Sequence, residues 1–436
     1  MSILAPVRPD RDRVVAQHLA DRIAALAAAR PVEALNKARA LAQATLADGG
    51  VPTAREEDWR HTNVRELLAR DYAVGPAPEQ DLVVPAPLAA GCDRLVFVGG
   101  VFRPALSTLG ELPAGMTLGA MSQLGFPSLG TLARDVENTG QLGAVNLGFF
   151  LDGAVLRLER DVVAPRPIEV LFVDGADGVA RLQACRMRVE LAAGASALLI
   201  ERHLSLSAHE GLSDLSLRIG LEPNAELKHL RVQDLAPAAS QIARTWVDVG
   251  RDAAYHARTL VLGGAVSRHE PEIALNGRGA ACSFKGAMLL GGRQHGDLTS
   301  RILHFAQDTK AEEALRFALD GNARGVFQGL IAMDVGAARA DGRLSAKTLL
   351  LSAKAQIFAK PELRILHDDV QAAHGATSGK LDEAALFYLR SRGVPFAEAR
   401  RLLVSAFLGE VLGGLSEETD AASAALLEGR LAEGAR

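Results

Sequence analysis

The chain has 436 residues, which is long for one ordinary hydrophobic core, and its 48% hydrophobic and 23% charged content is typical of a globular protein. The net charge of −4 gives no reason to expect nucleic acid as a partner. No apolar run approaches the roughly 20 residues that span a bilayer, and the start lacks the pattern of a signal peptide. We therefore expect a cytoplasmic protein that binds neither nucleic acid nor membrane.

The three cysteines, Cys92, Cys185 and Cys282, lie far apart and form no CxxC pair. This spacing indicates neither a disulfide framework nor a zinc ribbon. We expect each thiol to be a small buried group, because a lone thiol without an adjacent base is a poor nucleophile.

Residues 1–90 are predicted to form an N-terminal helical region and a linker. Apolar residues recur at helical spacing at Val15, Leu19, Ile23 and Leu26. A second helix is expected over 32–47 and a short one near 64–68. The prolines between residues 74 and 87 are typical of a linker.

Residues 91–366 are predicted to form a β core. Short alternating runs such as 168–173 and 226–232 are separated by Gly, Asn or Asp. A sandwich or barrel would close after about seven to ten strands, and this region offers more. An extended solenoid of narrow coils is therefore favoured over a single barrel, and the low aromatic content of 4% suits it.

The tail, residues 367–436, is predicted to be helical again, with helices over 381–392, from Pro395 onward, and between 416 and 435. The middle helix has an apolar face that includes Leu402, Leu403, Phe407 and Val411. This face fits either a partner protein or the chain's own β core, and the pattern leaves both open.

Several familiar motifs are absent or deceptive. The run 375–380 resembles a phosphate loop, but its glycines are separated by three residues rather than four, and Leu381 stands where Ser or Thr would hold magnesium. No HExxH, GxSxG or GxGxxG motif occurs. His295 and His304 are expected to satisfy buried polar partners rather than to bind metal.

His374 stands in a more distinctive stretch. His367, Asp368 and Asp369 precede it and Gly375 follows it. Imidazole and carboxylate are suitable ligands for iron or zinc, and partial exposure would let a second chain complete the ligand set. The alternative is a helix-entry turn, capped by one of the two aspartates, in which the imidazole packs. The residues alone favour neither.

Runs spread over most of the chain carry a family signature, namely 55–62, 292–295, 326–329, 349–352, 360–363, 368–370, 374–377, 381–383 and 387–393. Together they resemble the SufB/SufD family, the scaffold subunits of the SUF iron–sulfur cluster assembly machinery. Within that family the run 374–377 is similar to the SufD branch. Many SufD sequences carry Cys two residues before the histidine, and here that position is Ala372, so His374 is the conventional ligand that remains.

The resemblance implies a mainly β fold, a right-handed parallel β-helix flanked by helical ends, in agreement with the solenoid expected above. It also implies a non-enzymatic scaffold that pairs laterally with SufB and docks the SufC ATPase on its C-terminal helices, with Leu402, Leu403, Phe407 and Val411 as candidate contacts. His374 would then meet a transient iron or iron–sulfur cluster at the SufB interface. No tightly bound cofactor is expected in the isolated chain, and whether that chain is a monomer or a homodimer stays open.

The alternative function is a β-helix enzyme acting on carbohydrate or acyl substrates. Such an enzyme would need acidic or basic side chains that converge on one groove. The sequence shows no obvious group of this kind, although separate coils could bring one together.

Overall fold

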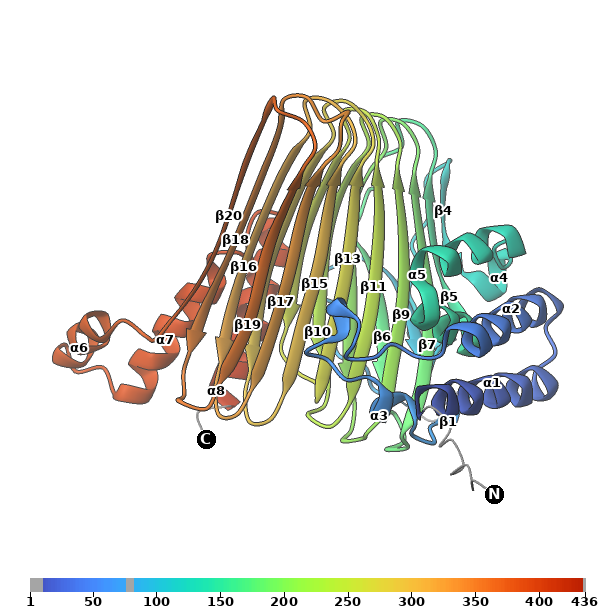
Figure 1. Ribbon diagram of the computed structural model, residues 1–436, viewed down its shortest axis with the longest axis horizontal. Helices are drawn as coiled ribbons and strands as arrows, with labels where there is room; N and C mark the ends of the chain where they lie inside the picture. Colours follow the sequence, from blue (N-terminus) through green and yellow to red (C-terminus); the bar gives the residue numbers. More distant parts are fainter. Residues whose placement is uncertain (1–10, 76–81, 434–436) are drawn as a thin grey trace, which may run out of the picture.

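The computed structural model describes residues 11–75 and 82–433, and its core is a parallel β-solenoid built from two long sheets (Figure 1). Successive strands alternate between the sheets. The strands of sheet A, in spatial order, are β19 (Gln356–Ile365), β17 (Arg324–Met333), β15 (His295–His304), β13 (Val266–Leu275), β11 (Ser240–Val249), β9 (Leu212–Leu221), β7 (Arg181–Leu191), β5 (Phe150–Leu158) and β4 (Met116–Ala120), with β1 (Ala73–Val74) beside β7.

Sheet B runs alongside and ends with a short antiparallel pair, as sheet A does. Its strands, in spatial order, are β20 (Val370–Gly379), β18 (Ala340–Leu350), β16 (Lys310–Leu319), β14 (Ala281–Leu290), β12 (Ala254–Val261), β10 (Glu226–Asp234), β8 (Ser196–Ser205), β6 (Ile168–Asp174), β2 (Asp93–Val98) and β3 (Val101–Phe102). The β2–β3 and β4–β5 pairs are antiparallel, and the pairs along the solenoid are parallel. The mainly β solenoid expected from the sequence is confirmed.

Alternation along each strand sends every second side chain into the space between the sheets. Because neighbouring strands pair in register, inward positions stack into rows that run along the solenoid. One such row contains Leu199, His229, Ala257, Phe284, Glu313, Leu344 and His374. Leucine, valine, isoleucine and alanine dominate the interior, as narrow coils require. The three cysteines are buried and free.

The coil corners explain the Asn and Asp residues between the strands. Asp161, Asn224, Asp252 and Asp308 all adopt positive φ at these turns. Asn and Asp tolerate this left-handed conformation better than most residues with a side chain.

The N-terminal helices α1 (Arg11–Ala29) and α2 (Glu33–Gly49) pack with α5 (Leu129–Phe149) against the outer surface of sheet A. The buried side chains of Leu19 and Ile23 in α1 join one cluster with Leu182, Leu212 and Ile242 of the sheet. The shorter helical segments are η1 (Glu57–Trp59), α3 (Arg65–Leu68), η2 (Pro104–Leu106) and α4 (Met121–Leu124).

The C-terminal helices lie on the opposite side of the solenoid. α7 (Phe396–Gly409) and α8 (Glu417–Glu433) contribute to a cluster with sheet B, in which Val404 and Leu408 meet Ile200, Leu230 and Leu260. α6 (Glu383–Ser391) buries none of its residues and lies beyond the last strands at the left of Figure 1. None of the described helices is both long enough and apolar enough to cross a bilayer.

The structure differs from the expected outline in two places. Helices α4 and α5 interrupt the range 91–366, where Ser128 caps α5 by accepting a hydrogen bond from the backbone N–H of Thr131. Strand β20 lies within the range 367–436, which was expected to be helical, and it extends sheet B. Small residues fill this strand, so its sequence shows little contrast between its two sides. Part of the expected linker over 74–87, namely 76–81, lies outside the described residues.

Glu313 is an exception to the apolar interior. Its carboxylate is buried in the row described above and accepts a hydrogen bond from Ser300 Oγ at 2.6 Å. Burial raises the pKa of Glu313 from its ordinary 4.5 to about 7, because desolvation disfavours the charged form. The folded chain therefore holds a proton on this group at a pH where the unfolded chain has released it.

We expect this one group to lower the free energy of unfolding by about 3 kcal/mol as the pH rises from 4.5 to 7, with little further change above that range. Glu313→Gln should remove this part of the pH dependence and make the protein more stable than the wild type at pH 8. Denaturant unfolding at several pH values measures the effect. Glu312→Gln is the matched control, because its exposed carboxylate pairs with Lys285, and it should keep the wild-type slope. An unchanged slope in Glu313→Gln would contradict the assignment.

Candidate functional site

The solenoid ends at two adjacent strands, β19 and β20. Each pairs on one side only, with β17 and β18 respectively, and no other described strand pairs with their outer edges. Such an edge presents a row of backbone N–H and C=O groups to solvent. Natural proteins protect exposed edges with charges or proline, and β19 follows this rule with Lys360, Pro361 and Glu362. β20 contains no Lys, Arg, Asp, Glu or proline, so its edge is open to another strand.

His374 lies on this unprotected strand. It pairs in register with Leu344, and Val370 and Ala372 on the same side of β20 pack against the solenoid interior. Residues two apart in a strand share a face, so His374 belongs to the inward row. As the last member of that row it is exposed to solvent. The imidazole therefore stands at the open mouth of the solenoid.

The helix-entry turn considered for this stretch is wrong. The N-cap of α6 is Asp382, which accepts hydrogen bonds from the backbone N–H groups of Ala384 and Ala385. Asp368 and Asp369 instead lie in the bend before β20. The run 375–380 overlaps a strand rather than a loop leading into a helix, so it is not a phosphate loop.

The described part of the chain contains no preformed metal-binding site. Within residues 11–75 and 82–433, no group of three or more His, Cys, Asp or Glu side chains is arranged to hold a metal ion. Ala372, two residues before His374, supplies no ligand. Within this strand His374 offers a single donor, and the remaining ligands of an iron ion would have to come from elsewhere.

The four apolar residues proposed for a partner divide into two groups. Leu402 is 39% exposed, and Leu403 is half-buried. Phe407 packs partly against the cluster on sheet B, with the Arg316 guanidinium 5.7 Å from its ring centroid. Val411 is 2% exposed and belongs to that cluster. Val411 thus packs against the chain's own β core, whereas Leu402 faces solvent.

The most exposed apolar side chains near Leu402 belong to α6. Phe387 is 73% exposed, and Tyr388 is also exposed. An Arg392 guanidinium lies 5.1 Å from the Tyr388 ring centroid, and Arg390 lies 5.8 Å from that of Phe396. An exposed set of aromatic and arginine side chains has the composition of protein-binding surfaces.

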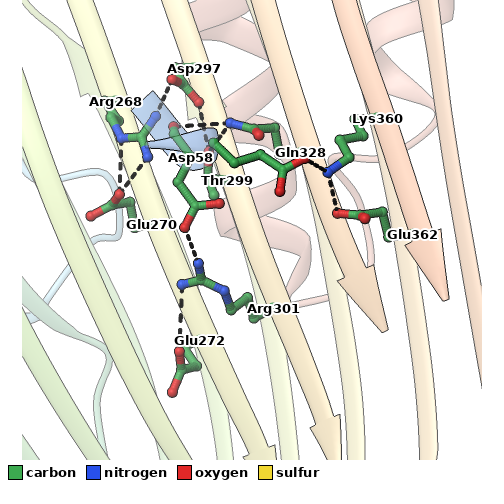
Figure 2. Close-up of polar contacts among 11 residues, drawn as sticks. Asp58, Arg268, Glu270, Glu272, Asp297, Thr299, Arg301, Gln328, Lys360 and Glu362 are labelled. Atoms are coloured by element: carbon green, nitrogen blue, oxygen red, sulfur yellow. Dashed lines mark hydrogen bonds and ion pairs between the residues drawn. The ribbon is translucent and has the colours of Figure 1, made fainter. Parts of the chain in front are cut away.

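A polar strap crosses the outer surface of sheet A near the same end of the solenoid. The strap comprises residues 57–62, which follow the N-terminal helices, and Figure 2 shows Asp58 among the polar side chains of the neighbouring strands. The ion pairs are Asp58 with Arg301 of β15 and Glu57 with Lys360 of β19. The Asp58 carbonyl oxygen also accepts a hydrogen bond from Gln328 Nε2 of β17 at 3.0 Å.

The strap is anchored by Trp59 on β13. The guanidinium of Arg268 lies 3.7 Å from the centroid of the Trp59 ring, and Arg268 is fully buried. A desolvated cation–π contact of this kind contributes about 2 kcal/mol. Burial by itself lowers the pKa of Arg268, but Glu270 and Asp297 on either side outweigh it and raise the pKa above its ordinary value. Arg268 is thus a fixed cation beneath the indole.

The two histidines that the sequence analysis assigned to structure have polar partners as expected. His295 Nε2 lies 2.9 Å from Thr62 Oγ1 of the strap, and Thr62 also bonds the carboxylate of Asp297. His304 Nδ1 lies 2.8 Å from Thr309 Oγ1. Burial lowers the pKa of His304 to about 4, so its imidazole is neutral near neutral pH.

A buried charged cluster escaped the sequence analysis. Glu201 lies inside the solenoid, where its carboxylate bonds His203 Nε2 at 2.6 Å and Arg231 Nε at 2.9 Å and lies 3.2 Å from His229 Nε2. Burial raises the pKa of Glu201, but Arg231 and the two imidazoles outweigh it and hold that pKa well below its ordinary range. The sequence feature that marks it is a run of three ionisable residues, Glu201-Arg202-His203, inside an otherwise apolar strand pattern.

The outer surface of sheet B has an open groove of about 610 Å³ over β12 to β20, which bears on the enzyme alternative. Two of the carboxylates that line it form ion pairs, Asp341 with Arg343 at 3.1 Å and Glu312 with Lys285 at 3.0 Å. A third, Glu313, belongs to the buried inward row, where it accepts a hydrogen bond from Ser300. Asp341 and Glu312 are each held by a cation, and the Glu313 carboxylate is buried inside the solenoid. These three carboxylates therefore do not face the groove as the acid and base that hydrolysis of a glycoside requires.

Comparison with known families agrees with this architecture. Residues 172–407 match the family described as SUF system FeS cluster assembly, SufBD core domain. Residues 17–170 match the SufBD protein N-terminal region. Together the two matches run from within α1 through the solenoid to near the C-terminal end of α7.

Individual relatives carry the same description. The chain is 28% identical to an iron–sulfur cluster assembly SufBD family protein of Synechocystis over 87% of this chain and 86% of the relative. It is 27% identical to the iron–sulfur cluster assembly protein SufD of Escherichia coli over 85% and 86%, and 25% identical to SufD of Bacillus subtilis over 64% of each. Because the core-domain match alone covers more than half of its residues, the chain belongs to the SufBD family of iron–sulfur cluster assembly proteins.

Proposed function

We propose that this chain is a SufD-type scaffold without catalytic activity of its own, which pairs with SufB and binds the SufC ATPase in the cytoplasm. The unprotected edge of β20, with His374 at the mouth of the solenoid, is the observation that carries this proposal. An exposed parallel edge of ten residues with no proline and no Lys, Arg, Asp or Glu is suited to pair with a strand of a second chain. The similarity to relatives named as iron–sulfur cluster assembly protein SufD supports the role in cluster assembly.

His374 gives this interface a chemical role. One imidazole is an incomplete ligand set for iron, so ligands from SufB would complete it when the two chains pair. The iron or iron–sulfur cluster is then cargo that both chains hold transiently. Ligands split between two chains make the affinity for the cluster depend on the relative orientation of those chains.

The C-terminal helices are suited to connect this interface to an ATPase. α6 extends away from the solenoid with Phe387 and Tyr388 exposed, and Leu402 of α7 lies on an exposed surface as well. Buried Val404 and Leu408 tie α7 to sheet B. A movement imposed on α6 and α7 by SufC would therefore reach the coils of the solenoid through a packed contact.

The enzyme alternative requires turnover by the isolated chain. The paired carboxylates of the sheet B groove and the place of the chain in an assembly family both favour the scaffold. Failure to associate with SufB and SufC, together with hydrolase or lyase activity of the purified chain, would reverse this choice.

Substitution of His374 by Ala should slow cluster formation by about tenfold or more in a reconstituted complex with SufB and SufC, because it removes the one conventional ligand that this chain offers. Visible absorbance follows the cluster, and gel filtration shows whether the complex remains intact. Gln371→Ala, on the opposite side of the same strand, is the control and should leave the rate unchanged. Cluster formation at the wild-type rate in His374→Ala would remove His374 from the mechanism.

Leu402→Asp and Phe387→Asp should each weaken SufC binding by about tenfold, because a charge placed in a desolvated apolar contact is costly. Isothermal titration of SufC into each variant measures the affinity. Val163→Asp, at an exposed apolar position far along the solenoid, should have no effect. Wild-type affinity in both α6 and α7 variants would place the SufC contact elsewhere.

A further inference from the structure

The strap, residues 57–62, does more than join the N-terminal helices to the solenoid. We propose that it is a positioning element for the open end: it holds β19, and through β19 the edge of β20, in the geometry that a partner strand needs. The part of this inference that concerns the partner rests on the function proposed above. The part that concerns β19 stands on the free chain alone.

Two contacts join the strap to the last strand of sheet A. Glu57 forms an ion pair with Lys360, and Lys360 also bonds Glu362 Oε2 at 3.0 Å. The ring of His61 stacks on that of Phe358, with 4.3 Å between centroids and an interplanar angle of 16°. None of the strands that the structure describes pairs with the outer edge of β19, so these side-chain contacts replace part of the restraint that another strand would give.

The strap can restrain β19 because the residues between and after Glu57 and His61 fix it to strands farther inside the sheet. Trp59 covers the buried guanidinium of Arg268 on β13, and Thr62 bonds His295 and Asp297 on β15. The two fixed strands lie farther inside the sheet, where each has neighbours on both sides. The strap therefore links β13 and β15, which are paired on both sides and resist fraying, to β19, which is paired on one side and can fray.

Restraint of β19 passes directly to the strand that carries His374. Only residues 366–369 separate β19 from β20. Within this connection, the Asp369 carbonyl oxygen accepts a hydrogen bond from Arg339 N–H, and the Leu366 N–H donates to the Met333 carbonyl oxygen at 2.8 Å. A displacement of β19 would thus shift the start of β20 and change the edge that a partner strand has to match.

The contacts with β19 can be removed without touching the anchor. Glu57 and His61 are both exposed, so the double variant Glu57→Ala, His61→Ala leaves Trp59, Thr62 and the buried core intact. Hydrogen exchange followed by mass spectrometry on the full-length chain should show amides of 356–379 exchanging about tenfold faster, with amides of 212–221 in β9 unchanged. Glu190→Ala is the matched control, because it removes an exposed ion pair with Arg157 from the far end of the same sheet.

A ring at position 61 tests the stacking contact itself. His61→Phe keeps an aromatic ring against Phe358 and should retain wild-type protection of 356–365, whereas His61→Ala should lose part of it. The double variant should also bind SufB about tenfold more weakly, as measured by titration, since its edge is no longer held in one geometry.

The results of these experiments test separate parts of the proposal. Unchanged exchange in 356–379, or an increase spread equally over β9, would overturn the positioning role. Faster local exchange with wild-type affinity for SufB would overturn the link to the partner. If the wild-type chain itself fails to bind SufB, the proposed function falls, and the exchange result still decides whether the strap positions β19.

Discussion

The in-register parallel pairing of strands is the constraint on which the rest of this structure depends. Once a strand pairs with the corresponding strand of the preceding coil, each inward position is stacked on the same position of its neighbours. A buried polar residue then needs a partner within its own coil or an adjacent one, as Glu313 finds in Ser300. The same row of inward positions continues from coil to coil along the solenoid. Its last described member is His374, which no further described strand covers. The exposed imidazole is a direct consequence of the solenoid ending there.

The two ends of the solenoid are finished differently. At the start, α1, α2 and α5 bury the outer surface of sheet A in an apolar cluster, and antiparallel strands β3 and β4 terminate the sheets. At the other end, α7 and α8 cover sheet B from the side but leave both strand edges open. The strap adds polar contacts across sheet A near this open end. Apolar packing covers the first coils of the solenoid. The strands of the last coil are held by side-chain contacts instead, and their edges are available to a partner.

The strap also shows why ion pairs alone are a poor measure of stability. Exposed pairs such as Glu57 with Lys360 contribute little, because water and salt screen them. The buried guanidinium of Arg268 is different, since it lies between an indole ring and two carboxylates and has no access to solvent. The anchor and the exposed pairs therefore have different tasks, one holding the strap to the sheet and the other orienting the strand at the edge.

The sequence by itself determined the fold class, the helical ends and the buried, unpaired state of the cysteines, because these follow from local periodicity and composition. The sequence could not reveal the length of the coil repeat, because that length varies. Successive residues of one inward row are 27 positions apart between Ala257 and Phe284 and 31 positions apart between Glu313 and Leu344. It also missed β20, whose Ala and Gly residues show no periodic contrast, and so it could not decide whether His374 packs in a turn or faces solvent. Only the tertiary structure brought residues 57–62 onto β13 to β19 and separated Val411 from Leu402, because these contacts join segments far apart in the chain and no local pattern encodes them.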